Sequence, residues 1–208
     1  MRVPVGVAAI LAAGTAGAYT TLVPQRIWPA YTVVVELDSG RAEGSIADAD
    51  HGQTAIVDAL NDAVDGWNGT VPGLVSASVQ PNRFVIGDGI STVTFSDPTG
   101  TCTGPCLAAT LTGYYTGMGV PYQIEDADIF VTKRKSTKFT SELEDPTIAS
   151  CAGEYYLDGT LTHEVGHVIG LGHSAVAGST MSAFAAACDL TADELDADDE
   201  SGALFLYP

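Results

Sequence analysis

Residues 163–173 read HEVGHVIGLGH, which fits the pattern H-E-x-x-H-x-x-G-x-x-H. The chain contains four histidines, and three of them, His163, His167 and His173, lie in this short stretch. Packing in a core gives no reason to concentrate histidines in this way, whereas a metal ion that needs several imidazole ligands does. The stretch therefore predicts a metal site carried by a helix.

The spacing of the three histidines indicates how they can share one ion. His163 and His167 are four residues apart, so on a helix their imidazoles lie on one face, one turn apart. Two imidazoles placed in this way can bind one Zn²⁺ at about 2.0–2.1 Å each. Gly170 is expected to end the helix, because glycine adopts the left-handed conformation easily, and the turn brings His173 back as the third ligand. Three histidines leave the fourth tetrahedral position to water, which is typical of catalytic zinc.

Glu164 follows the first histidine directly and points to the same side of the site. It reaches the metal less easily than the histidines do, so it suits a general base that acts on metal-bound water. A bare H-E-x-x-H also arises by accident on amphipathic helices, but the longer form fixes a third ligand and a helix-ending glycine as well. A structural zinc site usually has four protein ligands, and the one remaining histidine, His51, is far away in sequence.

These residues, with a methionine shortly after them, resemble the metzincins, a group of zinc endopeptidases, and among these the matrixins. The stretch Ser179-Thr180-Met181-Ser182 resembles the methionine turn of the group, in which the methionine forms an apolar floor beneath the metal. An ordinary core methionine is the alternative for Met181. Ser174 after the third histidine is similar to matrixins, and Ala183 stands where astacin-like enzymes usually have a zinc-approaching tyrosine.

The C-terminal stretch 195–207 resembles the closing helix of the matrixins. In that family the paired aspartates, here Asp198 and Asp199, tie this helix to the methionine turn and to the mature N-terminus. Residues 126–130 resemble the strand that precedes the active-site helix. The resemblance is strong over 160–207 and loose before that. His51 alone cannot build the second, histidine-bound zinc site of vertebrate matrixins, so the chain resembles a minimal, microbial catalytic domain.

The resemblance implies an α/β (α+β) metzincin-like fold: a twisted mixed sheet, two main helices, a zinc cleft and a small C-terminal subdomain that ends in a helix. It implies one catalytic Zn²⁺ and a zinc-dependent endopeptidase in which Glu164 is the general base. A substrate chain is expected to add as an antiparallel strand to the sheet edge at 107–112. Calcium ions stabilise many relatives, and this acidic chain could bind Ca²⁺ as well, for example at Asp88 or Asp126.

The periodicity of apolar residues predicts the individual elements. A helix is expected over 53–67, because Ile56, Leu60, Val64 and Trp67 recur at helical spacing. A second helix is expected from near 157 to Gly170, and Thr191 with Glu194 resembles a capping box that begins the last helix. Strands are predicted within 28–37 and at 75–79, 84–86, 92–95, 107–115 and 128–132.

The N-terminus has the features of a secretory signal peptide. Arg2 precedes an apolar run over 3–13, and Ala16-Gly17-Ala18 is a cleavage site of the A-x-A type. The run is too short for a good membrane span. The expected organisation is a signal peptide over 1–18 and a single metalloprotease domain over 19–208, with an upper subdomain of about 19–173 and a lower one of about 174–208. The protein is therefore expected to be extracellular.

Export permits disulfide bonds, and the four cysteines allow three connectivities. We favour Cys102 with Cys106, a tight clip, and Cys151 with Cys188, which ties the segment before the zinc helix to the loop after the methionine turn. A cysteine metal site is the weaker reading, because the chain has no Cys-x-x-Cys pair.

The formal net charge of −18 argues against nucleic acid as a partner, because phosphate contacts need a basic surface. Such acidity is compatible with cationic substrates, and a solvated acidic surface explains it more simply. We expect a monomer that binds protein or peptide substrates in a cleft. In matrixins the zinc helix and the loop after the third histidine, here 175–190, line the pocket beside the cleaved bond. Gly159 lies where the family often has a depth-setting side chain, so a roomy apolar pocket is expected.

Two other functions remain open. A zinc amidase that acts on cell-wall peptides uses the same chemistry on a different substrate, and the residues do not separate it from an endopeptidase. A secreted binding module could keep the fold without activity, although such a copy has no physical need for a glutamate beside the metal.

Overall fold

The computed structural model describes residues 19–29, 32–42, 52–81, 84–115, 122–133, 138–142, 147, 149 and 151–208. The expected signal peptide and His51 lie outside these residues. Among the described residues, no helix combines the length and the apolar character that a membrane crossing requires.

A mixed sheet forms the centre of the fold. Its strands are β1 (Arg26–Ile27), β2 (Val33–Asp38), β3 (Val75–Gln80), β4 (Ser91–Thr94), β5 (Ala108–Tyr115) and β6 (Tyr122–Val131). The parallel strands follow the order β3-β2-β4-β6, and β1 pairs in parallel with the first residues of β6. Strand β5 runs antiparallel along the other side of β6 and forms an edge of the sheet. A separate pair, β7 (Phe139–Thr140) with β8 (Tyr155–Tyr156), precedes the histidine helix.

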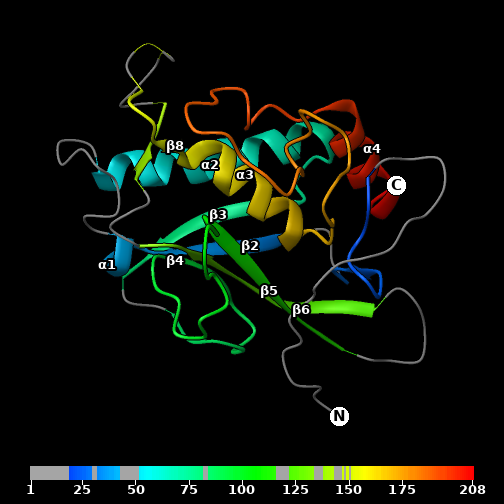
Figure 1. Ribbon diagram of the computed structural model, residues 1–208. Coiled ribbons are helices and arrows are strands. Elements are labelled where there is room, and N and C mark those ends of the chain that lie inside the picture. Colours follow the sequence, from blue (N-terminus) through cyan, green and yellow to red (C-terminus); the bar gives the residue numbers. More distant parts are fainter. Residues whose placement is uncertain are drawn as a thin grey trace.

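Two long helices cover one face of this sheet (Figure 1). They are α2 (Gly52–Thr70) and α3 (Leu157–Val168); the shorter helices are α1 (Ser39–Ala42) and α4 (Ala197–Leu206). Helix α2 turns an apolar stripe of alanine, isoleucine, leucine, valine and tryptophan toward the core, as its sequence period predicts. The indole of Trp67 at the end of this stripe donates a hydrogen bond to the carbonyl oxygen of Thr162, at 2.9 Å, and so fixes α2 against α3.

Most of the elements expected from the sequence are present. The helix expected over 53–67 is α2, and the strands expected at 75–79, 92–95, 107–115 and 128–132 are β3 to β6. The strand expected at 84–86 is wrong, because that segment pairs with no strand. Gly87 and Gly89 turn the chain there with φ angles of 70° and 85°, and the ring of Phe84 instead packs edge-on against Phe130 at 5.5 Å between ring centroids.

The expected start of the last helix is also wrong. Helix α4 begins after Asp196, whose side chain accepts a hydrogen bond from the backbone N–H of Asp198, while Asp199 accepts one from the backbone N–H of Asp196. This is a reciprocal capping box made of two aspartates. Thr191 instead donates through its N–H and its hydroxyl to Asp189.

Candidate metal centre

The structure brings the three histidines of the sequence motif together. Helix α3 carries His163 and His167 on one face, and the chain after it returns His173 to the same place. One ligand atom from each ring can be chosen so that all three lie within 4.8 Å of one another. The ring centroids are 4.7 to 5.2 Å apart. Within the described ranges of the chain, this is the only group of three or more histidine, cysteine or acidic side chains with such geometry.

The return of the third histidine depends on Gly170. Helix α3 ends at Val168 with Ile169 as its C-cap, and Gly170 follows with a φ angle of 105°, a conformation that strains any residue with a Cβ atom. A Cβ atom at this position would also collide with the carbonyl oxygen of Arg26. The chain then passes beside the N-terminal segment, where the N–H of Gly172 donates to the carbonyl oxygen of Thr20 at 2.8 Å. Gly170 therefore ends the helix and redirects the chain, as its position in the motif predicts.

Backbone carbonyl groups hold two of the imidazoles in a fixed orientation. His163 Nδ1 lies 2.7 Å from the carbonyl oxygen of Thr180, and His167 Nδ1 lies 2.8 Å from that of Leu171. A carbonyl oxygen only accepts, so each Nδ1 must carry the proton, and the lone pair of Nε2 is left for a metal. The donor set thus fits a zinc ion: three imidazoles converge, and at least two present the correct nitrogen.

For two of the histidines, burial disfavours the charged form of the ring. Burial, followed by the neighbouring imidazoles of His163 and His173, holds the pKa of His167 well below its usual range. Burial and the proximity of His163 lower the pKa of His173 to about 4. Because a ligating imidazole must be neutral, the lowered pKa of His167 and His173 suits both rings to bind a metal at neutral pH.

Glu164 is 4% exposed and lies beside the histidines on α3. Its Oε2 atom accepts a hydrogen bond of 2.6 Å from the hydroxyl of Thr110 on the edge strand β5. Burial raises the pKa of Glu164, whereas His163 and the hydroxyl of Thr110 act in the opposite direction. Thr110 lies outside the histidine motif, and no pattern in the sequence marks it as part of the site. Its only signal is its place in the edge strand expected to lie along the cleft.

Met181 packs beneath this arrangement and is 2% exposed. A Cβ atom at Gly166, between the two histidines on α3, would collide with the sulfur of Met181, so the glycine lets the methionine approach the helix closely. Asp199 of α4 accepts hydrogen bonds from the N–H groups of Thr180 and Met181, at 2.8 and 3.2 Å, and from the hydroxyl of Ser179. The methionine turn is therefore fixed by a buried carboxylate.

The neighbouring aspartate makes the other contact that the resemblance implies. Asp198 Oδ1 accepts a hydrogen bond of 2.7 Å from the backbone N–H of Tyr19, and its Oδ2 atom accepts one of 2.6 Å from the hydroxyl of Ser174. The two adjacent aspartates thus tie α4 to the start of the described chain, to the residue after the third histidine and to the methionine turn.

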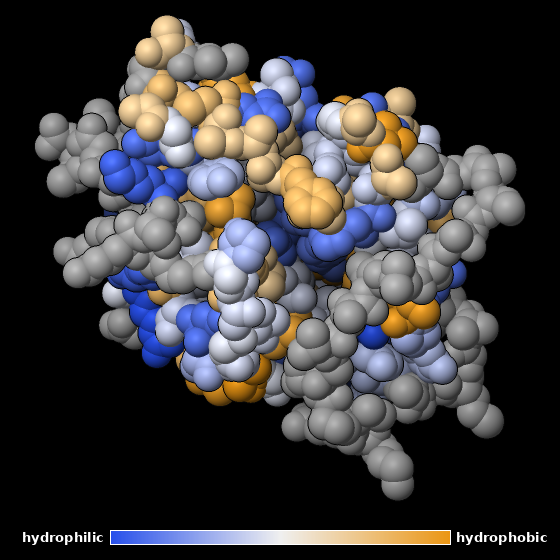
Figure 2. Space-filling view, in the orientation of Figure 1, coloured by the Kyte–Doolittle hydropathy of each residue, from blue (hydrophilic) through white to orange (hydrophobic). Residues whose placement is uncertain are grey.

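A cavity of about 650 Å³ opens in front of the histidines. Its lining includes the three imidazoles, Glu164, residues 107–112 at the edge of the sheet and several residues of the segment 178–192. Figure 2 shows a hollow near the centre of this face, with hydrophilic residues inside it and apolar ones along its border. Phe184 belongs to the lining and is 90% exposed.

The pocket beside the helix differs from the roomy apolar one that Gly159 suggested. A Cβ atom at Gly159 would collide with Ala192, so Ala192 already occupies the space that the glycine leaves. The lining there also includes the polar residues Thr160, Asp189 and Thr191. The missing side chain therefore lets the loop approach the helix and does not deepen the pocket.

Both favoured disulfides are present in the structure, Cys102 with Cys106 and Cys151 with Cys188. The first lies in the loop that leads into β5, and the second joins the segment before β8 to the loop after the methionine turn. Because Cys106 belongs to the cavity lining and Cys188 directly precedes Asp189 of that lining, the two bridges brace two separate segments of the cavity lining.

Asp88 and Asp126, the two residues named as possible calcium ligands, lie outside the histidine site. Asp126 is in β6, and Asp88 is in the loop before β4; burial, followed by the nearby charge of Asp88, raises the pKa of Asp126 to about 6. Oδ1 of Asp126 is buried and has no hydrogen-bond partner within the described part of the chain. These residues do not form a compact ligand group as the histidines do, and calcium binding remains a prediction.

Comparison with known proteins agrees with this geometry. The matrixin family profile, of peptidase family M10, matches residues 104–208, which include the edge strand, the histidine motif, the methionine turn and α4. The chain belongs to the matrixin family. The family implies a catalytic zinc ion and metallopeptidase activity.

No curated protein matches the chain in sequence. Among solved structures, a chain of the one described as "GM1 bound form of the ECX AB5 holotoxin" is similar at 12% sequence identity. The alignment covers 91% of this chain and 86% of that chain, with a TM-score of 0.46, a likeness too weak to carry an argument.

Proposed function

We propose that this protein is a secreted zinc-dependent endopeptidase that hydrolyses peptide bonds of proteins. The observation that carries the proposal is the arrangement of three converging imidazoles and one buried carboxylate on the wall of an open cavity. Three ligands that leave a position open to substrate are typical of a catalytic zinc ion, whereas a structural zinc ion is enclosed by four ligands.

His163, His167 and His173 would hold the metal, with the carbonyl oxygens of Thr180 and Leu171 orienting the first two rings. When bound, the zinc ion would supply a Lewis acid that polarises the substrate carbonyl and makes water a stronger nucleophile. Met181 would support the ligands from below through its contact with α3.

Glu164 would act as the general base. It would take a proton from the attacking water and return that proton to the amine nitrogen that leaves. The hydroxyl of Thr110 binds one carboxylate oxygen and leaves the other for the proton. Because Thr110 belongs to a strand and Glu164 to a helix, this bond holds the base with two rigid elements.

Strand β5 is the proposed docking edge for the substrate. It pairs with β6 on one side and with no other strand of the described residues. Residues 107–112 of this region line the cavity. An extended peptide could therefore bind antiparallel to β5 through main-chain hydrogen bonds, with little demand on its sequence.

Secretion is supported by the two disulfides, which form in oxidising compartments. The first residue after the proposed cleavage site is Tyr19, whose backbone nitrogen donates to Asp198. Cleavage after Ala18 would turn this nitrogen into an ammonium group facing a carboxylate, a stronger interaction than the amide makes. Mass spectrometry of the secreted protein should find Tyr19 at its N-terminus, and another first residue would refute this processing site.

The test of the activity is cleavage of denatured casein by the secreted protein, with and without a zinc chelator, beside the variant Glu164→Gln. Loss of cleavage with the chelator and with the variant supports a zinc endopeptidase. Cleavage that survives both refutes it. Cell-wall peptides in the same assay test the amidase alternative, which their cleavage in place of casein would favour. A folded, zinc-loaded protein that cleaves neither class would favour a binding module.

A further inference from the structure

One end of the cavity is formed by the start of α3 and by the segment 188–192. Gly159 and Thr160 line the cavity from the helix, and Asp189, Thr191 and Ala192 line it from the segment. Gly159 precedes His163 by four residues, so this end lies about 6 Å along the helix from the histidine site. A side chain next to a peptide bond held at the histidines can enter it.

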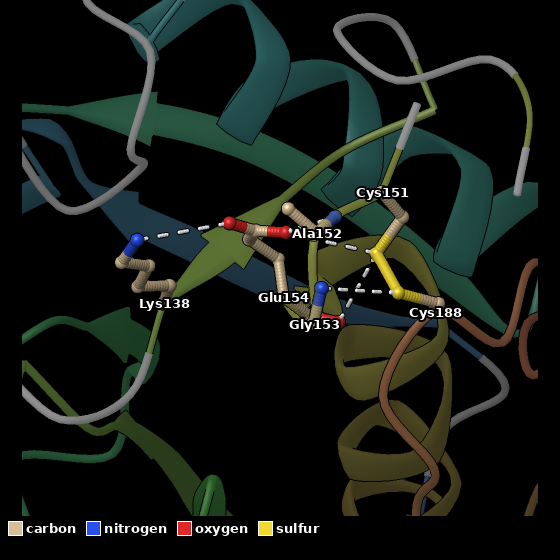
Figure 3. A network of polar contacts seen from close by, with 6 residues as sticks. All are labelled: Lys138, Cys151, Ala152, Gly153, Glu154 and Cys188. Atoms are coloured by element: carbon tan, nitrogen blue, oxygen red, sulfur yellow. Dashed lines mark hydrogen bonds and ion pairs between the residues drawn. A yellow bond between two sulfur atoms is a disulfide. The ribbon is translucent and has the colours of Figure 1, made fainter. Parts of the chain in front are cut away.

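The segment 188–192 is fixed to the rest of the protein at both ends, and Figure 3 shows the anchor at Cys188. Cys188 is bonded to Cys151, and its N–H donates to the carbonyl oxygen of Glu154 at 2.9 Å. At the other end of the segment, Ala192 packs directly against Gly159. Asp189 therefore lies between the disulfide at Cys188 and the contact of Ala192 with helix α3. These two attachments restrict the main chain of Asp189.

A buried glutamate reinforces this anchor. Glu154 Oε2 accepts a hydrogen bond of 2.7 Å from the N–H of Ala152, and Glu154 Oε1 lies 3.9 Å from Lys138 Nζ (Figure 3). The N–H of Gly153 points to Cys188 Sγ at 3.3 Å. Lys138 is thus paired with Glu154 and is not part of the cavity lining.

The carboxylate of Asp189 is held in one orientation. Its Oδ1 atom accepts hydrogen bonds from the N–H and the hydroxyl of Thr191, at 3.0 and 2.9 Å. Both bonds use the same oxygen, so neither of them occupies Oδ2, which can meet a ligand. The cavity lining, as the structure describes it, contains no lysine or arginine, and its other acidic residue is the proposed base Glu164. The surroundings are acidic too: burial raises the pKa of Asp193, and the charges of Glu194 and Asp189 raise it further.

We propose that Asp189 selects substrates with a lysine or arginine side chain next to the cleaved bond. The inference rests on the proposed endopeptidase function and specifies its substrate class. The long, flexible stem of lysine or arginine can cross the cavity and bring its charge to Oδ2. A charge pair in a partly enclosed cavity is worth more than one on an open surface, because water screens it less. Asp189 is a specificity-determining residue in this scheme and takes no part in the chemistry.

The test uses fluorogenic peptides that differ at one residue, placed on either side of the scissile bond, with lysine, arginine, methionine or glutamate there. For the wild-type protein we expect kcat/KM for the lysine and arginine peptides to exceed that for the methionine peptide about tenfold, and the glutamate peptide to be the poorest. Asp189→Asn keeps an acceptor for Thr191 and removes the charge, so the preference should disappear while the methionine peptide is cleaved as before. Asp189→Lys should reverse the order, and Asp189→Glu should restore it.

Asp65→Asn is the matched control, because it removes one exposed negative charge outside the cavity lining. It should leave the order of the peptides unchanged. If Asp189→Asn keeps the wild-type order of the peptides, Asp189 does not select the substrate. If Asp65→Asn abolishes that order as well, the overall charge of the protein causes the preference and the role of Asp189 is refuted.

A binding measurement separates this inference from the proposed activity. Fluorescence anisotropy of the lysine and methionine peptides with the folded, zinc-loaded Glu164→Gln variant requires no turnover. Tighter binding of the lysine peptide, lost on adding Asp189→Asn, supports the role of Asp189 even if the wild-type protein cleaves no peptide and the proposed function fails. Equal binding of both peptides refutes the role of Asp189 even where cleavage is observed.

Discussion

The histidine site and the acidic residues of β6 both bury ionisable side chains, and burial shifts the pKa of the two kinds of group in opposite directions. At the histidine site, backbone carbonyl groups bind the Nδ1 atoms of His163 and His167, and burial lowers the pKa of His167. In β6, Asp126 and Asp128 face away from Ala127 and Ile129, which pack in the main core. Burial, followed for Asp126 by the charge of Asp88 and for Asp128 by the charge of Asp126, raises their pKa to about 6 and about 8.

The two sites show that buried ionisable groups can either be oriented for binding or be destabilised by like charges and missing hydrogen-bond partners. The histidines need no charge to bind a metal, and the Nδ1 protons of His163 and His167 already have partners, so these two rings are oriented before the ion arrives. The two aspartates repel each other when ionised, and Asp126 Oδ1 has no hydrogen-bond partner in the described chain. The first site should therefore control activity and the second should control stability.

The largest expected effect is the loss of metal and activity at the histidine site. His167→Ala removes a ligand whose ring is almost fully enclosed, so zinc content and proteolysis should fall together. Glu164→Gln, in contrast, should keep the zinc and lower kcat by about 10²- to 10⁴-fold, the usual contribution of a general base. Metal analysis beside kinetics distinguishes the two variants. A His167→Ala protein that keeps a full equivalent of zinc would contradict the ligand assignment.

A smaller effect on the same site is expected from Thr110. Thr110→Val keeps the shape of the side chain but removes the hydroxyl that binds Glu164, so the base loses its fixed orientation. We expect kcat to fall about tenfold, as the loss of one hydrogen bond to a charged group predicts, with KM and zinc content little changed. Thr110→Ser is the control and should keep most of the activity. Equal activity of the valine and serine variants would show that the hydroxyl has no role.

The contrast between Glu164 and Thr110 shows which residues of the site can be predicted from the sequence. The motif predicts the three histidines, Glu164 and the turn at Gly170 because their spacing alone brings them together on and after one helix. Thr110 is 54 positions away from Glu164, and only the pairing of the sheet places it there. Asp196 was missed for a different reason: several acidic residues in a row offer alternative caps, and the true helix start depends on tertiary contacts of Asp198 and Asp199.

The aspartates of β6 should make stability depend on pH. Their pKa is higher in the folded protein than in the unfolded chain, so the folded protein binds more protons between pH of about 4 and 8. Their contribution to stability is therefore complete below the unfolded pKa and is lost as the pH rises through the folded values. We expect the melting temperature to fall between pH 5 and pH 9, by several degrees if the linkage amounts to a few kcal/mol.

Asp128→Asn tests this directly, because asparagine can still accept the hydrogen bond that the N–H of Thr92 donates to Asp128. The variant should be more stable than the wild-type protein at pH 9, should lose part of the difference between pH 5 and pH 9, and should keep its proteolytic activity. The control Asp65→Asn removes an exposed charge and should leave most of the pH dependence in place. If both variants behave alike, net charge and not the burial of Asp128 causes the effect.

The smallest expected effect comes from calcium, which could relieve the same repulsion without protons. A cation beside Asp126 would give its unpaired oxygen a partner, and Asp88 lies close enough to contribute a second charge. Calcium at ten times its Kd should stabilise the protein by about 1.4 kcal/mol, or a few degrees in melting temperature. The gain should be larger at pH 8 than at pH 5, where protons occupy the carboxylates, and Asp126→Asn should remove it. An equal gain in that variant would place the ion elsewhere, and the β6 aspartates would then differ from the histidine site in lacking any ligand at all.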